Sequence, residues 1–551
     1  MAIGSTLIDP RLEPALAEVS AAVATADLLR AGNLAERALR QGMAHPTFFN
    51  ARGLAFQAAG RYGEALEDFR RASAYLPRDA TIHNAIGVCL TGLERFGAAL
   101  KAFDEAIECD PYRAQSHFRR GAALSRLGNH EDAIAAYERA LQLDPHHADA
   151  MANLSLLLAR GGSESRALEL AERALSLKPG DTNALFALAT LDADRKRHAA
   201  VEARIRPLLD SPELSAHARV GAYGLLGDAL DGQSRYAEAF EIYNKRNEEL
   251  RRLHGAQFVS AESRAPDATG HMITYFEKTP AAQWKARPAK APEPGRDSPK
   301  EHVFLLGFLR SGTTLLEQVL GSSPEIVALE EKGTLNMLGS IYMTSEDGLD
   351  LLSSLDGQRL EDARKMYWAR VRELNVDIAG KIFLDKQPLN TIKLPLIAKL
   401  FPDAKVLFAL RDPRDVVFSC FRRQFRVNVT TYEFLSLTDA AKFYADTMRL
   451  AELYREKLSL NLYEHRYEDM VQDFEGRVRA VCDFIGTEWS DTMREFDKHG
   501  PAIDLRSPSA TQVRQPLYGE GQGQWRRYAE QLAPVMPILK PWVERFGYPP
   551  A

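Results

Sequence analysis

Small residues and prolines recur through the first half of the chain at a period of about 34 residues. The recurring residues form four columns: Gly53, Gly87, Gly121 and Ser155; Ala65, Ala99, Ala133 and Ala167; Ala72, Ala106, Ala140 and Ala174; and Pro77, Pro111, Pro145 and Pro179. Small side chains let the two helices of a hairpin approach closely, and a proline ends the second helix. A single hairpin cannot bury its apolar face alone, so the period predicts a solenoid of stacked helical hairpins.

The repeat is regular in its middle and weaker at its edges. The rows agree best over residues 46–181, where aromatic residues fill the space between neighbouring helices: Tyr62, Phe69, Phe96, Phe103 and Tyr137. Residues 12–45 lose the glycine and aromatic columns, as expected of a capping repeat, and the pattern returns in part over residues 221–252. The array resembles the tetratricopeptide repeat family in period and columns, and we expect about six hairpins within residues 1–255.

The array contains no cluster of candidate catalytic residues. Three roles stay open for it: binding of a peptide or protein on its concave face, self-association into a homo-oligomer, and rigid spacing. We therefore look for the chemistry of this protein in the second half of the chain.

Proline and charge are concentrated between the two halves, in KARPAKAPEPGRDSPK at residues 285–300. This composition indicates an exposed linker. The segment before the linker offers Met272, Tyr275 and Phe276 for burial. We therefore expect residues 256–300 to form a partly packed segment followed by a linker.

Short apolar stretches alternate with helical patterns over residues 301–551. Strands are predicted at residues 303–306, 381–386, 405–412 and 461–469. This alternation indicates an α/β domain with a mostly parallel sheet. Ligands of such sheets bind beyond the carboxyl ends of the strands, and polar residues follow those ends here: Arg310, Lys386, Arg411 and Tyr467.

The first of these strands leads into the loop GFLRSGTT and then into a helix that begins near Thr314. The backbone N–H groups at a helix N-terminus suit phosphate or sulfate, and Arg310, Ser311 and Thr313 add donors. The plainer alternative is an ordinary turn whose Ser and Thr only cap the helix. The loop has neither the Gly-Lys pair of a Walker A motif nor the Rossmann pattern G-x-G-x-x-G, which disfavours an NTPase or a dehydrogenase.

The loop resembles the 5′-phosphosulfate-binding loop of sulfotransferases, most closely that of the tyrosylprotein sulfotransferase type, which carries RSGTT at this point. A second stretch, KVLFALRDPRDVVFSCFRR, is similar to the 3′-phosphate site of the same family. Repeats fused to such a domain resemble bacterial tetratricopeptide sulfotransferase proteins. The resemblance implies a P-loop-like α/β fold and 3′-phosphoadenosine 5′-phosphosulfate (PAPS) as the donor, without a metal.

The resemblance also assigns roles to residues by their position in these motifs. It implies donor binding by Arg310, Ser311, Gly312, Thr313, Thr314, Arg411, Ser419, Arg423, Tyr467, Ser509, Gln512 and Val513. It implies Glu331 as the catalytic base, with Lys386, Arg310 and Ser509 stabilising charge on the leaving oxygen. Glu330 is the alternative base, because register alone separates it from Glu331.

The stretch SATQVRQPLYGEGQGQW at residues 509–525 resembles the late loop of the family, which closes over the donor, and one of its residues departs from the family pattern. The family carries a lysine just before the tryptophan of this loop, and Gln524 stands there in this chain. A neutral amide cannot supply the missing charge. The candidates that could replace it are Arg514, Arg526 and Arg527.

Composition narrows the class of protein. The net charge of −5 argues against a nucleic-acid-binding surface, and no window offers the roughly 20 apolar residues of a membrane span. The four cysteines are scattered and form no C-x-x-C pair, which favours a reducing cytoplasm and argues against a zinc site. His302 and His465 are interpreted as core or strand-edge histidines.

The leading hypothesis is therefore a sulfotransferase whose repeat array recruits or orients the acceptor. A nucleotide-dependent P-loop kinase and a non-enzymatic repeat scaffold with a vestigial nucleotide-binding domain are the alternatives. The resemblance favours peptide tyrosine as the acceptor and leaves a polysaccharide, a lipid or a small phenol open.

Overall fold

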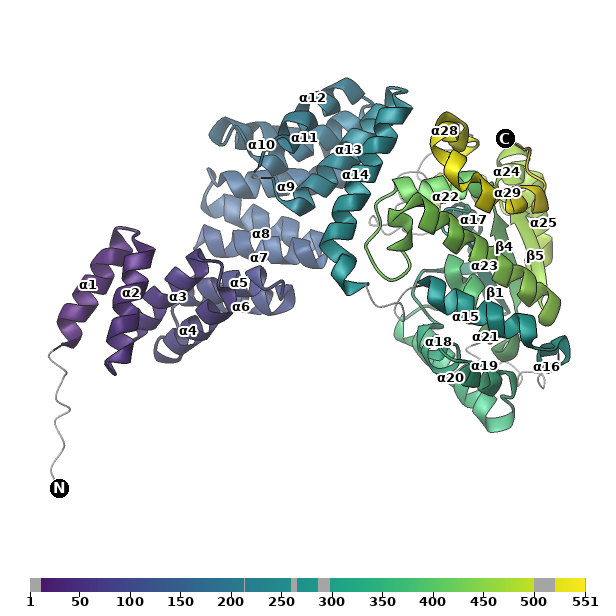
Figure 1. Cartoon of the computed structure of the whole chain (residues 1–551), viewed down its shortest axis with the longest axis horizontal. Coiled ribbons are helices and arrows are strands. Elements are labelled where there is room, and N and C mark those ends of the chain that lie inside the picture. The colour runs from purple at the N-terminus through teal and green to yellow at the C-terminus, as the bar shows by residue number, and fades with distance from the viewer. Residues whose placement is uncertain (1–10, 213, 259–264, 286–297, 500–520, 551) are drawn as a thin grey trace. The chain divides into compact units, whose positions relative to one another are not determined.

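The computed structural model describes residues 11–212, 214–258, 265–285, 298–499 and 521–550 of the chain (Figure 1). The chain divides into two compact units, Met1–Leu208 and Leu209–Ala551. Each unit has its own buried apolar clusters.

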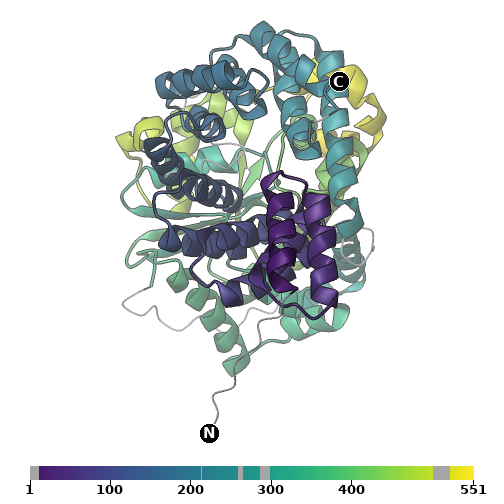
Figure 2. The same cartoon turned by 90° about the vertical axis from the view of Figure 1, so that its left-hand side faces the viewer.

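The first unit is an array of helical hairpins. Its helices are α1 (Leu12–Ala24), α2 (Leu28–Arg40), α3 (Pro46–Ala58), α4 (Tyr62–Tyr75), α5 (Ala80–Gly92), α6 (Phe96–Cys109), α7 (Ala114–Leu127), α8 (His130–Leu143), α9 (Ala148–Arg160), α10 (Glu164–Leu177), α11 (Thr182–Asp194) and α12 (His198–Leu209). Figures 1 and 2 show these hairpins beside one another in chain order. The predicted solenoid is therefore confirmed.

The glycine column of the repeat makes room for the aromatic column. A Cβ atom added at Gly53 would lie 2.8 Å from Phe69, and one added at Gly87 would lie 2.3 Å from Phe103. Both distances are too short for a carbon contact, so only glycine lets the aromatic ring lie against the facing helix. The repeat columns of the sequence therefore correspond to the helix–helix contacts within each hairpin.

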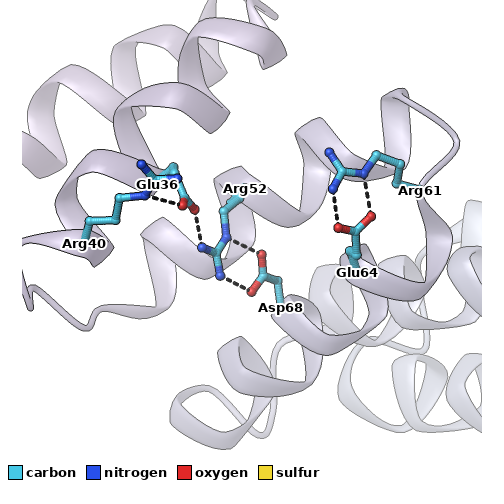
Figure 3. Close-up of polar contacts among 6 residues, drawn as sticks. All are labelled: Glu36, Arg40, Arg52, Arg61, Glu64 and Asp68. Atoms are coloured by element: carbon cyan, nitrogen blue, oxygen red, sulfur yellow. Dashed lines mark hydrogen bonds and ion pairs between the residues drawn. The ribbon is translucent and has the colours of Figure 1, made fainter.

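Charged side chains also tie neighbouring hairpins together (Figure 3). Arg52 of α3 donates two hydrogen bonds of 2.7 Å to Asp68 of α4, and it also donates to Glu36 of α2. Asp68 is buried, with 2% of its surface exposed, so its charge needs such a partner. The hydrogen bond from Arg52 also lowers the pKa of Glu36. These ion pairs give Glu36, Arg52 and Asp68 a structural role, which is to hold α2, α3 and α4 together.

The second unit begins with the hairpin of α13 (Ala216–Gly232) and α14 (Tyr236–His254). A Cβ atom added at Gly227 would lie 2.5 Å from Tyr243, which repeats the glycine–aromatic contact of the array. This hairpin nevertheless groups with the residues that follow it, and the boundary between the units falls between Leu208 and Leu209. The predicted limits at residues 255 and 300 rest on sequence pattern and stay predictions.

The centre of the second unit is a parallel sheet. Its strands are β1 (Glu301–Gly307), β2 (Ile326–Glu330), β3 (Ile382–Lys386), β4 (Lys405–Leu410) and β5 (Asn461–Arg466), in the order β2-β3-β1-β4-β5. The predicted parallel α/β domain is confirmed. Strand β2 was not predicted, because its short apolar stretch runs directly into two glutamates.

Helices and short 3₁₀ segments surround this sheet. They are η1 (Gly255–Gln257), α15 (Ala265–Lys278), α16 (Ala281–Lys285), α17 (Thr313–Gly321), α18 (Asn336–Tyr342), α19 (Glu346–Ser353), α20 (Gly357–Glu373), η3 (Pro388–Lys393), α21 (Leu394–Leu400), α22 (Pro413–Arg422), η4 (Glu433–Leu435), α23 (Leu437–Lys457), α24 (Tyr467–Gln472), α25 (Phe474–Ile485), η5 (Asp491–Met493), α26 (Phe496–His499), η7 (Gln524–Tyr528), α28 (Ala529–Leu532), η8 (Ala533–Val535) and α29 (Met536–Arg545). One face of the sheet joins α17 and α25 in an apolar cluster that includes Val303, Leu305, Leu316, Val319 and Val481.

The opposite face of β1 packs on aromatic rings. His302 and Phe304 alternate with the residues that face α17, and both lie against Tyr367 of α20. His302 also forms a 2.9 Å hydrogen bond through Nε2 with the Tyr367 hydroxyl. His302 is therefore a core histidine, as predicted.

The segment before the linker packs onto the α/β domain through α15. The rings of Phe276 and Tyr454 lie 4.8 Å apart, and the Tyr454 hydroxyl lies 3.7 Å from the sulfur of Met272. Both residues of α15 are buried. Helix α15 is thus part of the same hydrophobic core as α23.

Candidate functional site

The loop after β1 has the backbone of an anion site. Arg310 and Gly312 have φ angles of 69° and 92°, and α17 begins directly afterwards at Thr313. Ser311, Thr313 and Thr314 are buried. The free N–H groups at the start of α17 and its dipole favour a bound anion at this point. The structure therefore places the predicted loop at the predicted strand-to-helix turn.

The two predicted donor-binding motifs meet beside this loop. Arg310 donates through Nε to the hydroxyl of Ser419 on α22 at 3.0 Å, and Arg411 donates to the backbone oxygen of Arg310 at 2.9 Å. Loss of water lowers the pKa of Arg310 to about 9, and the nearby charges of Arg423 and Arg411 add to the effect. Such a concentration of positive charge suits a ligand with several negative groups.

Tyr467 lies against the loop from the other side, as the first residue of α24. The guanidinium of Arg411 lies 5.0 Å from the centre of its ring. A Cβ atom at Gly312 would lie 2.8 Å from the Tyr467 side chain, and one at Gly521 would lie 2.5 Å from its hydroxyl. The two glycines therefore fix this ring beside the arginine cluster.

A second cluster lies at the carboxyl end of β3, around Lys386. The side chain of Lys386 is fully buried, and its Nζ lies 3.0 Å from Glu331, 3.0 Å from Glu317 and 3.5 Å from Glu330. Lys386 and Leu305 are partners in the sheet, so this cluster and the loop after β1 belong to the same sheet edge. The structure thus brings Lys386 and Glu331 into direct contact.

The three glutamates around Lys386 differ in exposure. Their side chains are 45% exposed at Glu331, 19% at Glu330 and 1% at Glu317. Glu330 ends β2, and Glu331 follows it with a φ angle of 47° while its N–H donates to the backbone oxygen of Lys386 at 2.9 Å. Glu331 is therefore the carboxylate that an incoming molecule reaches most easily.

Burial and charge act against each other in this cluster. Burial alone would lower the pKa of Lys386, but Glu317, Glu331 and Glu330 raise it well above its ordinary value. Burial raises the pKa of Glu317 to about 7, which Lys386 opposes and the other two glutamates reinforce. Lys386 consequently stays protonated at neutral pH.

Glu317 was not predicted as a site residue. It lies on α17 within the apolar run LLEQVL, where Leu316, Val319 and Leu320 are fully buried. A carboxylate on the buried face of a helix needs a cationic partner, and this pattern was the available signal.

Hydrogen bonds of the neighbouring residue Asp385 support the same cluster. Asp385 precedes Lys386, and it accepts hydrogen bonds from Thr334 at 2.6 Å and from Tyr367 at 2.7 Å. Burial raises the pKa of Asp385. Because Thr334 closely follows Glu331, these bonds hold the Glu331 loop against the end of β3.

Part of the predicted site lies outside the described residues. Ser509, Gln512, Val513 and Arg514 belong to residues 500–520, and their roles stay predictions. Gln524 begins η7, where Asp415 of α22 accepts hydrogen bonds from the backbone of Gly523 and Trp525 at 2.7 and 2.8 Å. Arg526 and Arg527 are exposed.

The described part of the chain contains neither a candidate metal site nor a candidate membrane span. Its His, Cys, Asp and Glu side chains form no group of three or more that could hold a metal ion. None of its helices is both long enough and apolar enough to cross a membrane.

Comparison with known proteins also separates a repeat array in the first half of the chain from an α/β domain in the second half. The sulfotransferase family matches residues 302–491, and tetratricopeptide repeat families match residues 50–114 and 114–147. An uncharacterized protein of Aquifex aeolicus is 27% identical over 349 residues, which cover 61% of this chain and 43% of that protein. Protein-tyrosine sulfotransferase A of Caenorhabditis elegans is 25% identical over 261 residues, covering 45% of this chain and 67% of that enzyme.

Among solved structures, the chain is similar to YrrB, described as a tetratricopeptide repeat protein with an unusual peptide-binding site. The two are 24% identical with a TM-score of 0.29, and the match covers 32% of this chain and 91% of YrrB. The chain spans less than half of the Aquifex protein. From the family matches, the protein combines tetratricopeptide repeats with a domain that belongs to the sulfotransferase family.

Proposed function

We propose that this protein transfers a sulfuryl group from PAPS to an acceptor hydroxyl. The observation that carries the proposal is the hydrogen bond from Arg310 to Ser419, which joins the loop after β1 to the helix after β4. The match of the sulfotransferase family to residues 302–491 supports it. The protein-tyrosine sulfotransferases among the relatives support it as well.

The residues present fit a nucleotide that carries phosphate at two positions. The loop from Arg310 to Thr314 would hold the 5′-phosphosulfate through its backbone N–H groups and hydroxyls. Arg411, Ser419 and Arg423 would hold the 3′-phosphate, since a planar guanidinium can bind two phosphate oxygens at once. Burial is the main cause of the lowered pKa of Arg310, and a polyanion bound here would offset the repulsion from Arg423 and Arg411 that adds to it.

The proposed chemistry uses the second cluster. PAPS supplies an activated sulfur–oxygen bond, whose cleavage releases adenosine 3′,5′-bisphosphate. Glu331 accepts the proton of the acceptor hydroxyl while that oxygen bonds to sulfur. Lys386, Arg310 and Ser509 stabilise the negative charge that develops on the leaving oxygen. Glu317 has a separate role: its contact with Lys386 keeps that side chain charged when Glu331 binds the acceptor hydroxyl instead of Lys386.

Backbone conformation supports the choice of Arg310 and Glu331. Both are non-glycine residues with positive φ angles, of 69° and 47°. This conformation is costly for residues with a side chain, and it is common at functional sites, where the surrounding structure holds it in place. The Arg310 side chain contacts Ser419 of α22, and the Glu331 side chain contacts Lys386 at the end of β3.

For the acceptor, we propose a tyrosine in a peptide or protein that the repeat array recruits. The named activity of the relatives supports tyrosine, and the solenoid supports a peptide partner. A reducing cytoplasm is proposed as its setting, because the four cysteines are free thiols in the structure. A polysaccharide, lipid or phenol acceptor and self-association of the array are the competing possibilities.

Calorimetry with adenosine 3′,5′-bisphosphate and ADP tests the proposal. Both ligands carry an adenosine and two phosphates, and only the first places one at the 3′ position. We expect adenosine 3′,5′-bisphosphate to bind at least about tenfold more tightly, the effect of roughly one charge-assisted contact. Tighter binding of ADP with Mg²⁺ would favour a kinase, and binding of neither nucleotide would favour the scaffold. Transfer of labelled sulfate into a cell extract would then identify the acceptor.

A further inference from the structure

The last four carbonyl groups of a helix have no partner within the helix. At the end of α22 two of these carbonyls bind side chains of α14. Arg246 donates to the backbone oxygen of Arg422 at 2.7 Å and to that of Phe421 at 2.9 Å, and Asn247 donates to Phe421 at 3.1 Å. Arg246 is 2% exposed. A side chain from the last repeat-like hairpin therefore caps a helix of the sulfotransferase domain.

The cap is a charged one. Burial lowers the pKa of Arg246 to about 10, so the guanidinium stays protonated at neutral pH. A cation at a helix C-terminus interacts favourably with the helix dipole. Asn247 also accepts hydrogen bonds from Arg246 at 2.9 and 3.0 Å, which fixes the plane of the guanidinium.

Other residues of the hairpin surround the same helix end. Asp231 of α13 lies 3.4 Å from Arg422 and accepts a hydrogen bond from Tyr528. Asp228 lies 3.7 Å from Arg423 and accepts a hydrogen bond of 2.8 Å from Tyr243. The hairpin therefore contacts the backbone oxygens at the end of α22 and the side chains of Arg422 and Arg423.

This helix end carries two of the residues assigned to the 3′-phosphate. Ser419 lies in the last turn of α22, and Arg423 follows its final residue with an extended backbone. The backbone N–H of Arg423 donates to the backbone oxygen of Ser419 at 3.2 Å. Arg246 fixes the backbone at residues 421 and 422. This backbone leads directly into Arg423 and therefore sets the position of its Cα atom.

We propose that Arg246, with Asn247, is a positioning residue for the 3′-phosphate of the donor. By holding the end of α22, it makes Ser419 and Arg423 converge on one anion. The inference rests on the proposed function, because it assumes that these two residues bind the 3′-phosphate. It assigns to the α13–α14 hairpin a role in donor selectivity, beside any role of the array in acceptor binding.

The test compares two ligands that differ only in the 3′-phosphate, adenosine 3′,5′-bisphosphate and AMP, by calorimetry on the full-length protein. In Arg246→Met the apolar stem remains and the cap is lost. We expect affinity for the bisphosphate to fall by about tenfold or more, and affinity for AMP to change by less than about twofold. Arg246→Lys keeps the charge with a different geometry and should give an intermediate ratio.

Arg251→Met is the matched control. Arg251 lies on the same helix, and it binds Asp439 of α23. This variant should keep the wild-type ratio of the two affinities. If Arg246→Met does not fold, Asn247→Leu removes the bond to Phe421 and the two bonds that orient Arg246, while it keeps the guanidinium itself. It should lower the same ratio by a smaller factor.

The outcomes separate the inference from the proposed function. If the wild type binds both ligands equally, the assignment of the 3′-phosphate site is wrong. If the wild type prefers the bisphosphate and the Arg246 and Asn247 variants keep that preference unchanged, the cap has no positioning role. An equal loss for both ligands in Arg246→Met would likewise overturn the inference, because it would show general destabilisation.

Discussion

The Nε of Arg310 lies 3.0 Å from the hydroxyl of Ser419, although 109 residues separate the two in the chain. One residue belongs to the loop after β1 and the other to the helix after β4, and these two strands are neighbours in the sheet. The contact therefore makes a single site of two motifs that were found independently in the sequence.

Replacing Glu331 by Gln should leave donor binding largely unchanged and slow sulfuryl transfer by a factor of about 10² or more, because the base is lost. The amide keeps the shape of the side chain and can still accept a hydrogen bond from Lys386. Steady-state rates together with calorimetry of adenosine 3′,5′-bisphosphate check both halves of this expectation. Glu330→Gln is the matched control, and a larger loss of rate in that variant would make Glu330 the base.

Glu317→Gln should become more stable relative to the wild type as the pH rises. Burial raises the pKa of Glu317 from 4.5 to about 7 in the folded protein. The wild type therefore loses stability between these values, by at most roughly 3 kcal/mol, and the glutamine variant does not. Urea unfolding at pH 4.5 and pH 8 measures the difference.

Tryptophan fluorescence is a suitable signal for that experiment, because all five tryptophans of the chain lie beyond residue 283. The signal therefore reports the second unit alone. A stability difference between Glu317→Gln and the wild type that is the same at both pH values would contradict the shifted pKa. An exposed carboxylate on another helix of the same unit, Glu373 of α20, provides the control as Glu373→Gln.

His302→Phe should protect the second unit against acid. Burial lowers the pKa of His302 to about 3, so the folded protein keeps this ring neutral while the unfolded chain binds a proton below pH 6.5. Stability is thus fully present above pH 6.5 and falls on acidification, by roughly 2 kcal/mol at pH 5. The phenyl ring removes this dependence and costs the hydrogen bond to Tyr367 at every pH.

The same fluorescence measurement at pH 7 and pH 5 checks the His302 prediction. The slope of stability against pH is the quantity to compare, since the lost hydrogen bond shifts both points equally. An identical slope in the wild type and His302→Phe would show that this histidine does not couple folding to pH.

Gly87→Ala should destabilise the repeat array by about 1–3 kcal/mol, the usual cost of overpacking a core. Its Cβ atom would lie 2.3 Å from Phe103. Gly97→Ala, on the partner helix of the same hairpin, is the control, because its Cβ atom meets nothing within 4 Å. Thermal unfolding followed by circular dichroism should separate the two variants, and equal melting temperatures would contradict this account of the glycine column.

Much of the fold followed from local patterns. The repeat columns predicted the hairpins because each column corresponds to one contact, such as that of Gly53 with Phe69. The strand predictions correspond to β1, β3, β4 and β5, and the pattern is clearest in β1 and β4, since a buried parallel strand is apolar on both faces. The motif around Arg310 and the position of Lys386 placed two clusters at one sheet edge, and the structure brings their members into contact.

Other features depend on contacts between distant parts of the chain. The apolar run of α17 marks Glu317 as a buried carboxylate, but its partner Lys386 lies 69 positions later in the chain, and no local pattern identifies that partner. The hydrogen bonds of Arg246 to α22 join residues 175 and 176 positions apart, and no local pattern reveals them. Strand β2 was missed because Glu330 and Glu331 are typical of a helix start as well as of a strand end.

The grouping of α13 and α14 with the second unit affects where the α/β domain can be cut for use in a fusion protein. Their sequence belongs to the repeats, yet Arg246 and Asn247 complete the end of α22. A fusion protein cut at residue 255, where the repeat pattern ends, would leave those carbonyls exposed. An engineered version of the α/β domain should therefore start before Ala216, so that it includes the α13–α14 hairpin.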